Sequence, residues 1–573
     1  SSVSCPSVPP AKEGSAVRTD CSSSVGYTRQ QPQTRAAEAS IAMSSSALAV
    51  LAAIWAQMRF IRLAVLVVCR EEPLSTWLFQ GPDRTSCVLR AASLAASLAC
   101  IAFPGPAALF ASLTTTLALS WMLLPYEVDN SGTYGVLADA NLWFGLAWSW
   151  AAGRDAEEGW QMCAPAARSI FGTTYVFAAL AKLNSDYANV RKSSCTVFTL
   201  LVGEGFVPAA LTRRVLALLG DGFLLALLHL MLILLEVVEL TIPLLLVFGD
   251  TRTAAFVVWA FHLALGSIAY DYSVIAVASL VLSAPPEQVE HLAYVSTTPT
   301  ARLAATAIAL GGCWRIQAGR CRELGSPEHV LALLWLCACH PSLWLDESAT
   351  TPPGLLAALA GADSPPLPLA VSGLLLLGAT VANGLGPYLG YKTVATWAMF
   401  SNLHVEGGKT NHWLVPASSQ LSGCCRDLVT VVATDSELLR NFHTYSSFDS
   451  ACEGRGLTPL QGFARRTGCQ MTSHANSVLG RGGEVASIFP YRVPRFQLRR
   501  MVALEVLPCT RDFFVEYALP GEGGRRRFEV RGGELTPDSD PHLARAPPLL
   551  LQKLTTFKSV LADDRDVGIC HGP

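Results

Sequence analysis

Long apolar runs separated by short polar links fill the chain between residues 45 and 386. A helix needs about 20 apolar residues to cross a hydrocarbon core of about 30 Å. Because several runs are short for that purpose, the pattern predicts roughly eight transmembrane helices, with ten as an upper bound. The fold class that we expect is therefore an all-α polytopic membrane bundle. The candidate spans are 45–68, 87–103, 107–124, 136–152, 166–184, 223–248, 253–283, 301–313, 328–344 and 367–386.

The segments outside these runs have a different character. Residues 1–42 are rich in Ser, Thr, Pro, Gln and Ala, which predicts a disordered leader or a targeting segment. Met43 stands directly before the first run, so either translation starts there or the leader is an unprocessed presequence. Residues 417–573 carry more charges, prolines and glycines and no run of membrane length. We expect a small soluble α+β region there.

Within this C-terminal region, RDFFVEYALPGEGGRRRFEVRGGEL contains two stretches of aromatic and β-branched residues around a glycine-rich turn. This pattern predicts a β-hairpin. The arginines 525–527 and the segment RVPRFQLRR either lie against anionic lipid headgroups or are solvated surface residues.

Composition agrees with a membrane protein and excludes one class of partner. Of the 573 residues, 51% are hydrophobic and only 15% are charged, and the mean hydropathy is +0.36. A net charge of -2 gives no basic surface to neutralise phosphates, so we expect no nucleic-acid partner. The 17 cysteines lack metal-ligand spacing, and we interpret most of them as packing residues. The expected partners are membrane lipids and other membrane proteins.

Ionisable residues inside apolar runs are costly and commonly face a cavity or a partner. Lys182 lies near the end of YVFAALAKLNSDYANV and shares a helix face with Tyr175. An amine in apolar surroundings has a lowered pKa and can act as a base. Alternatively, a lysine at the end of a span extends its amine to the interface, and position alone favours this interpretation.

Two further apolar runs carry ionisable residues. FLLALLHLMLILLEVVELTIPLLLVF contains His229, Glu236 and Glu239; the first two are seven residues apart and share a helix face. A carboxylate there could pair with Lys182, orient a histidine or relay protons, and a structural ion pair fits the spacing equally well. The run TRTAAFVVWAFHLALGSIAYDYSV has Arg252 at its start and His262 in its interior.

Several blocks of the chain resemble the HTTM domain, the transmembrane module shared with the vitamin K-dependent gamma-carboxylase. They are YVFAALAKLNSDY, EVVELTIPLLLVFGDTR, FHLALGSIAYDYSVIAVASLVL and GPYLGYKTVATWAMFSNLHVEGGKTNHWLVP. The resemblance implies an HTTM-like transmembrane domain over 43–386, followed by an interfacial loop block over 387–416. Weaker similarity continues through PYRVPRFQLRR and PPLLLQKLTTFKSV.

The resemblance also implies a reaction. In the carboxylase, a lysine in the context AKL deprotonates a reduced quinone, and Lys182 matches that position. It implies a vitamin K-like reduced quinone as cofactor, an isoprenoid quinone as partner, and an endoplasmic reticulum membrane, with a plastid or another organelle as alternatives. The carboxylase has an asparagine-histidine pair at the start of the helix before the lysine helix. In this sequence the similar segment reads DANLWFG, with Asn141 present and Leu142 in place of the histidine.

The hypothesis from the sequence is an intramembrane site for a quinone or isoprenoid, with gamma-carboxylase or epoxidase-like chemistry. The candidate catalytic residues are Lys182, Glu236 and His262, and the candidate substrate-binding residues are Tyr175, Asn141, His229 and Arg252. The alternative is a noncatalytic lipid-binding or scaffold subunit in which Lys182 and Glu236 form a structural pair. A transporter lacks support because no inverted repeat is apparent.

The polar loop SNLHVEGGKTNHW follows the last predicted span. Its His-x-Glu followed by a histidine six residues later is not a recognised metal spacing, so we predict no metal site. We expect a hydrogen-bonded loop that caps the helical bundle.

Overall fold

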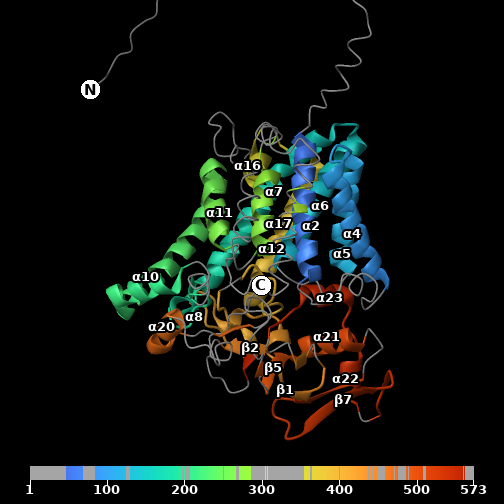
Figure 1. Ribbon diagram of the computed structural model, residues 1–573. Coiled ribbons are helices and arrows are strands. Elements are labelled where there is room, and N and C mark those ends of the chain that lie inside the picture. The colour runs from blue at the N-terminus through green and yellow to red at the C-terminus, as the bar shows by residue number, and fades with distance from the viewer. Residues whose placement is uncertain are drawn as a thin grey trace, which may run out of the picture. The chain divides into compact units, whose positions relative to one another are not determined.

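A computed structural model shows a helical bundle followed by an antiparallel sheet with its own helices (Figure 1). Contacts divide the chain into residues 1–44 and 45–573, and all of the described residues belong to the second unit. The expected leader at 1–42 and the span at 328–344 lie outside the described residues, as does 301–313 except for three residues. The structure describes residues 47–68, 84–123, 130–196, 199–200, 207–248, 251–265, 270–284, 289, 304, 306–307, 354–361, 364–398, 401–436, 439–440, 444–447, 459–469, 472–474, 486–487, 490–506, 512–537, 539–558 and 560–561.

Helices form at most of the apolar runs, and their buried faces share one hydrophobic core. The expected run at 253–283 is two helices rather than one. The helices of the bundle are α2 (Ala47–Val68), α4 (Arg84–Ala102), α5 (Ala107–Leu123), α6 (Asn130–Ala152), α7 (Ala156–Lys182), α8 (Ser185–Ala188), α10 (Ala209–Phe248), α11 (Thr251–Leu265), α12 (Tyr270–Leu282), α16 (Leu355–Ala360) and α17 (Leu367–Leu389).

The prediction of roughly eight transmembrane helices is wrong. Among the described residues, only two helices are long and apolar enough to cross a membrane: Ala209–Val247 within α10, and α17. α5, α11 and α12 are short, whereas α2 and α4 carry the buried arginines Arg59 and Arg90. Many of the other residues in these helices are alanine, serine, threonine and glycine, which pack well in a helical core but contribute little hydropathy.

The two apolar helices nevertheless indicate association with a membrane. α10 is kinked at Gly220, whose φ of 72° only glycine adopts readily. Beyond the kink, large apolar side chains remain exposed along the helix instead of entering the core. These side chains are Phe223, Leu227, Leu230, Ile233, Leu234, Val237, Leu240, Leu244 and Val247. An exposed apolar surface of this length is typical of contact with lipid.

The C-terminal part contains a six-stranded antiparallel sheet with the order β8-β7-β6-β1-β5-β9. Alternate residues of its strands are buried, which follows from the two-residue period of a strand. The strands are β1 (Leu428–Thr434), β5 (Tyr491–Pro494), β6 (Phe513–Ala518), β7 (Arg525–Arg531), β8 (Glu534–Leu535) and β9 (Val560–Leu561), and the helices are α21 (Arg495–Val506), α22 (Pro541–Ala544) and α23 (Leu549–Leu554).

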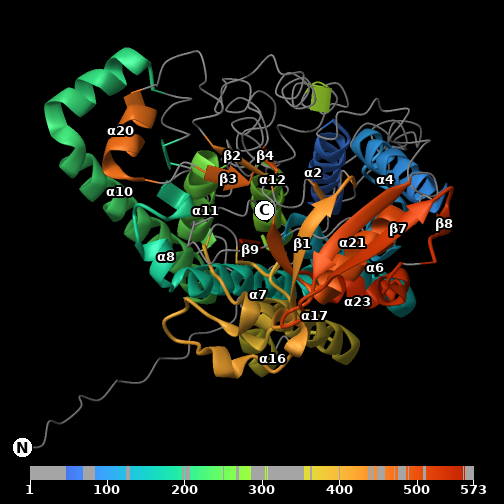
Figure 2. The same ribbon diagram turned by 90° about the horizontal axis from the view of Figure 1, so that it is seen from below.

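A second sheet has three strands in the order β3-β2-β4, with β2 at Thr444–Ser447, β3 at Thr472–His474 and β4 at Ala486–Ser487. Helix α20 (Pro459–Thr467) packs beside the first half of α10 (Figure 2). Arg466 of α20 binds both carboxylate oxygens of Asp221 at 2.9 Å. Three short 3-10 turns, η2 (Glu406–Gly408), η3 (Ala417–Ser419) and η4 (Gly423–Cys425), lie between the bundle and the first strand.

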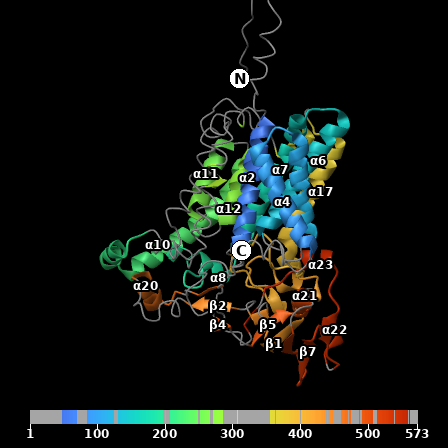
Figure 3. The same cartoon turned by 45° about the vertical axis from the view of Figure 1, so that its right-hand side comes forward.

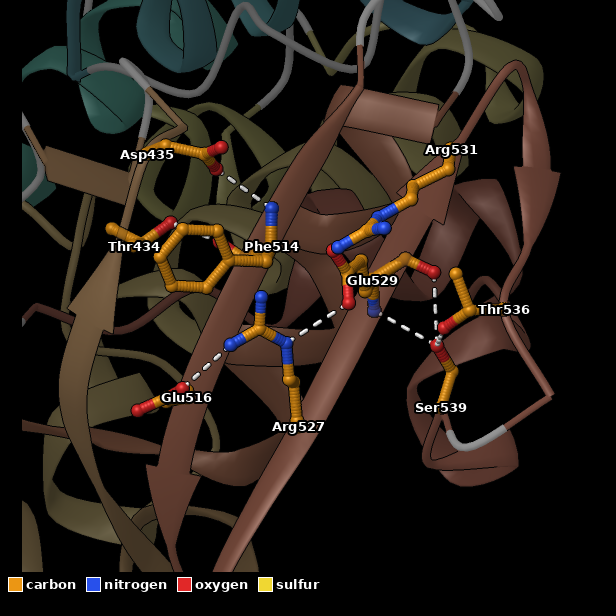
Figure 4. Close-up of polar contacts among 9 residues, drawn as sticks. All are labelled: Thr434, Asp435, Phe514, Glu516, Arg527, Glu529, Arg531, Thr536 and Ser539. Carbon is orange, nitrogen blue, oxygen red and sulfur yellow. Dashed lines mark hydrogen bonds and ion pairs between the residues drawn. The ribbon is translucent and has the colours of Figure 1, made fainter.

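The predicted hairpin is confirmed: β6 and β7 pair antiparallel, with Phe513 opposite Val530 and Ala518 opposite Arg525. Its arginines are bound to carboxylates of the sheet itself (Figure 4). Arg527 contacts Glu516 at 2.7 Å and Glu529 at 3.0 Å. These intramolecular pairs favour the interpretation of solvated surface arginines over contact with lipid headgroups.

Candidate functional site

The candidate site lies at the C-terminal end of α7. The Asp155 side chain caps the first turn by accepting from the Glu157 N–H at 3.0 Å, and the acidic residues there suit the positive end of the helix dipole. Lys182 is the last residue of the helix, at its negative end. Its side chain is 3% exposed, so Lys182 does not extend its amine to solvent.

Lys182 forms an ion pair with Glu239 of α10. The amine lies 2.7 Å from Glu239 Oε2 and 2.9 Å from Oε1, and it also contacts the Ala178 carbonyl at 3.4 Å. Burial acts to lower the pKa of Lys182, but the Glu239 carboxylate more than offsets it, so the pKa is raised. The lysine is therefore an ammonium group at rest, rather than the neutral base that desolvation alone predicts.

Glu236 lies one helical turn before Glu239, on a neighbouring position of the same face of α10. Its two carboxylate oxygens are buried and have no hydrogen-bond partner. Glu236 also acts electrostatically on Lys182, although the ion pair itself is formed by Glu239. The sequence hypothesis named Glu236 as the partner, and the structure corrects this to Glu239.

Tyr187 and Cys195 complete the surroundings of the amine, and sequence reasoning missed both. The Tyr187 ring centroid lies 5.9 Å from Lys182 Nζ, and its hydroxyl donates to the Leu232 carbonyl at 3.2 Å. Burial raises the pKa of the Cys195 thiol to about 12, so it is protonated and is not a thiolate nucleophile. In the sequence, only the short separation between Tyr187 and Lys182 could have indicated that the Tyr187 ring lies beside the amine.

The polar loop after α17 closes the end of α7, as predicted. Asn184 donates to the carbonyls of Ala181 and Ser401 at 2.8 and 2.6 Å. The loop residue Asn411 donates to Asn184 Oδ1 at 3.3 Å. His412 lies 2.8 Å from the Leu180 carbonyl through Nε2, while its Nδ1 accepts backbone N–H groups, which places the proton on Nε2.

The backbone of this block is held in an unusual conformation. Ala395, Trp397 and Asn402 have φ angles of 57°, 64° and 55°, which side chains other than glycine rarely adopt. Hydrogen bonds fix the bulky Trp397, whose backbone N–H donates to Asn130 Oδ1 and whose indole donates to the Thr380 carbonyl, both at 3.0 Å. Such conformations persist where the surroundings over-determine them. Within the described part of the chain, no group of three or more His, Cys, Asp or Glu residues could hold a metal ion.

The structure places two other predicted residues together but away from the amine. The Tyr175 hydroxyl and His262 Nε2 share a hydrogen bond in the core. Tyr175 precedes Lys182 by seven residues, or about 10 Å along the helix axis. His262 therefore lies about two turns from the Lys182–Glu239 pair and does not set its protonation by direct contact.

The remaining predicted residues are not part of this cluster. Asn141 Nδ2 donates to the Cys163 carbonyl at 3.0 Å, and Cys163 precedes Lys182 on α7 by about 28 Å of helix. His229 is exposed on α10. Arg252 lies in the first turn of α11, and its side chain falls outside the described residues.

A second buried ion pair connects α2 and α6. Arg59 Nη2 binds Asp139 Oδ2 at 2.8 Å, and the Trp55 indole donates to Asp139 Oδ1 at 2.8 Å. Both charged side chains are at most 3% exposed. The signal in the sequence was the presence of arginines in one apolar run and of Asp139 in another, which sequence reasoning did not use.

Comparison of the chain with protein-family models, with curated proteins and with solved structures finds no match.

Proposed function

We propose that this chain is a membrane protein of the HTTM type in which Lys182, Glu239 and Glu236 form a proton-transfer site for a lipid-soluble substrate of the hydroquinone class. The observation that carries the proposal is the second carboxylate, Glu236, whose buried oxygens have no hydrogen-bond partner. A structural ion pair needs only Glu239. A buried carboxylate without a partner is costly and is a common feature of functional sites.

The residues fit a reduced quinone as the substrate or cofactor. Glu236 is an acceptor without a donor, and its neighbours in the sequence of α10 are apolar. A reduced quinone, when bound, supplies hydroxyl protons to such a site. Glu236 would accept a hydrogen bond from one of these hydroxyls, and Lys182 would be the proton acceptor.

The ion pair determines how Lys182 can act as a base. The ammonium group must first give a proton to Glu239, which is in hydrogen-bond contact at 2.7 Å. The neutral amine then accepts a proton from the substrate, and Glu239 holds the displaced one. Burial of both groups excludes water from this exchange.

The resemblance to the gamma-carboxylase extends the proposal to epoxidase-like or carboxylase-like chemistry, in an endomembrane or a plastid. Carboxylation itself has less support here. Leu142, which replaces the histidine, is fully buried, and Asn141 is bound to the Cys163 carbonyl far from Lys182.

A noncatalytic lipid-binding or scaffold subunit is the second candidate function. The observation that favours it is the bidentate contact between the Lys182 amine and Glu239, which suits a pair that locks α7 to α10. Under this alternative, Glu236 has no role in binding a small molecule.

The test is a mass-spectrometric inventory of quinones and other isoprenoids that co-purify with the detergent-extracted protein. Glu236→Gln keeps the shape and removes the charge without breaking the ion pair. We expect wild type to retain a quinone or isoprenoid and Glu236→Gln to retain about tenfold less, because a hydrogen bond to a charged group is lost. The unfolding temperature should stay the same or rise, since a buried charge is removed.

Glu534→Gln, at an exposed position of β8, is the matched control and should retain the same amount as wild type. Equal retention by wild type and Glu236→Gln would contradict the proposal and favour the scaffold function. Recovery of only bulk lipids from the wild type would have the same meaning.

A further inference from the structure

Helix α10 is too long for a single membrane span. Its apolar part, Ala209–Val247, has 39 residues and is therefore about 60 Å long, twice the thickness of a hydrocarbon core of about 30 Å. The kink at Gly220 divides it into residues 209–219 and residues 221–247. The longer part alone measures about 40 Å and can cross a membrane with some tilt. The shorter part, residues 209–219, is not needed for a span, and we call it the leading segment of α10.

The leading segment carries an exposed apolar stripe. Its members follow the spacing i, i+4, i+7 and i+8, which places them on one face of the helix: Leu211, Val215, Leu218 and Leu219. All four side chains are exposed, and that of Leu218 is 83% exposed. A helix face in contact with water carries polar residues at such positions. Exposed apolar side chains resume at Phe223 beyond the kink, so the stripe leads into the apolar surface of the longer part.

Helix α20 fixes the bend and covers a different face of the leading segment. Leu216 before the kink and Leu224 after it pack in one cluster with Phe463 of α20. Figure 2 shows α10 curving around α20, and Figure 3 shows the same two helices side by side. Arg466 of α20 also binds the carboxylate of Asp221, directly after the kink, at 2.9 Å. The bend is therefore a packed feature, and the stripe on the neighbouring face stays uncovered.

The charges of the leading segment are all positive. It contains Arg213 and Arg214, both exposed, and no acidic residue. Arg214 precedes Leu218 by four residues and thus lies beside the stripe, whereas Arg213 lies further around the helix. A helix with an apolar stripe and arginines on its other faces is typical of segments that lie in a membrane interface. Its positive charge favours a leaflet that contains anionic lipids.

We propose that the leading segment of α10 is an interfacial anchor that lies along the membrane surface. Its stripe contacts acyl chains, while Arg213 and Arg214 bind the headgroups of anionic phospholipids. The position of the segment commits the stripe to lipid rather than to a protein partner. Because Leu219 directly precedes the kink from which the apolar part of spanning length begins, the segment lies at the membrane surface whenever that part is inserted. This anchor does not depend on the chemistry at Lys182.

The test replaces Leu218 of the full-length protein by the photo-cross-linking residue p-benzoylphenylalanine. The protein is reconstituted in nanodiscs of phosphatidylcholine, or of an equal mixture of phosphatidylcholine and phosphatidylglycerol, and mass spectrometry identifies the adducts after illumination. We expect lipid adducts, with a yield at least about twofold higher in the anionic nanodiscs.

The same replacement at Leu535, an exposed position on the edge strand β8, is the control and should give few lipid adducts. A yield of lipid adducts at position 218 no higher than at position 535 would overturn the anchor. Adducts at position 218 with a second copy of the chain or with another protein, in place of lipid, would overturn it in favour of a protein interface.

Two double variants, made in the protein with the cross-linker at position 218, test the role of the arginines. Arg213→Gln with Arg214→Gln should lower the yield of lipid adducts in anionic nanodiscs about threefold or more, because both cations near the headgroups are lost. Arg213→Lys with Arg214→Lys keeps the charge and should retain the original yield. Equal yields from the two double variants would refute the binding of anionic headgroups. Where the glutamine variant does not fold, salt at about 1 M replaces it, since salt screens the attraction, and an unchanged yield would have the same meaning.

Discussion

Two buried lysines of this protein have opposite electrostatic surroundings. Lys182 lies against the carboxylate of Glu239, which stabilises its charged form. Burial destabilises the charged form of Lys392, and the nearby Lys553 and Arg500 destabilise it further. The same side chain at nearly the same burial is thus an ammonium group at one site and close to neutrality at the other. Burial disfavours the charged form at both sites; the neighbouring charges oppose this effect at Lys182 and add to it at Lys392.

At the scale of the residue, Lys392 predicts a dependence of stability on pH. The pKa of Lys392 is about 7 in the folded protein, whereas its ordinary value, which applies to the unfolded chain, is 10.5. Between these values the unfolded chain binds more protons, so the free energy of unfolding rises from about pH 7 to about pH 10.5 through this group. Below about pH 7 both states are protonated and the contribution is constant.

Lys392→Met should remove this slope and raise the free energy of unfolding by roughly 1–3 kcal/mol at pH 7. The measurement is chemical denaturation across this pH range in a buffer without phosphate. Lys409→Met, at an exposed loop position, is the control and should keep the slope. A slope that survives in Lys392→Met would show that another group causes it.

At the scale of the element, the position of α7 is set by its crossing with α6. A Cβ on Gly145 would lie 2.5 Å from the Gly159 carbonyl oxygen, and one on Gly159 would lie 2.3 Å from that of Gly145. The two backbones are therefore too close for any side chain at this point. This contact fixes where α7 crosses α6, and it thereby fixes the position of Lys182 along α10.

Gly145→Ala should destabilise the protein by about 1–3 kcal/mol, because the added methyl group forces the helices apart. Gly222→Ala is the matched control, since a Cβ there would meet nothing within 4 Å. In that helical position alanine should be neutral or stabilising by up to about 1 kcal/mol. Thermal unfolding of both variants measures the difference, and equal destabilisation would contradict the close crossing.

At the scale of the whole molecule, the main finding is a large apolar surface that the core does not cover. Exposed leucines and valines follow α10 beyond Gly220, and α17 exposes Leu367, Leu374 and Leu375. The sheet at the end of the bundle has an ordinary charged surface in which arginines pair with carboxylates. This contrast predicts that the two helices, rather than the sheet, hold the protein in a membrane.

Val237→Asp places a charge on the exposed face of α10, where the wild-type side chain is 50% exposed. It should impair insertion at a cost of about 2.5–3.5 kcal/mol if the site is at the centre of the span. The measurement is the fraction of protein that remains in membranes after alkaline carbonate extraction. Leu535→Asp, on the edge strand β8, should leave this fraction unchanged. Equal extraction of Val237→Asp and wild type would contradict the spanning role of α10.

The sequence by itself determined where helices and the hairpin form, because apolar periodicity and turn residues act locally. It also indicated that Lys182 is an unusual charge in an apolar helix. It overestimated the number of spans because runs of alanine, serine and threonine form helices for packing as well as for membranes. Hydropathy along one helix does not report whether its surface meets lipid or another helix.

Only the tertiary structure decided which residues meet. Glu236 and Glu239 are three residues apart, so both are compatible with a partner on a neighbouring helix, and the packing of α10 on α7 selects Glu239. The same packing places Asn141 of α6 against the Cys163 carbonyl, about 28 Å along α7 from Lys182, so Asn141 does not lie beside the amine. The cations Lys392, Arg500 and Lys553 come from distant segments, so no local pattern could have joined them. Contacts between elements depend on crossing points such as Gly145 and Gly159, which a pattern along one element does not contain.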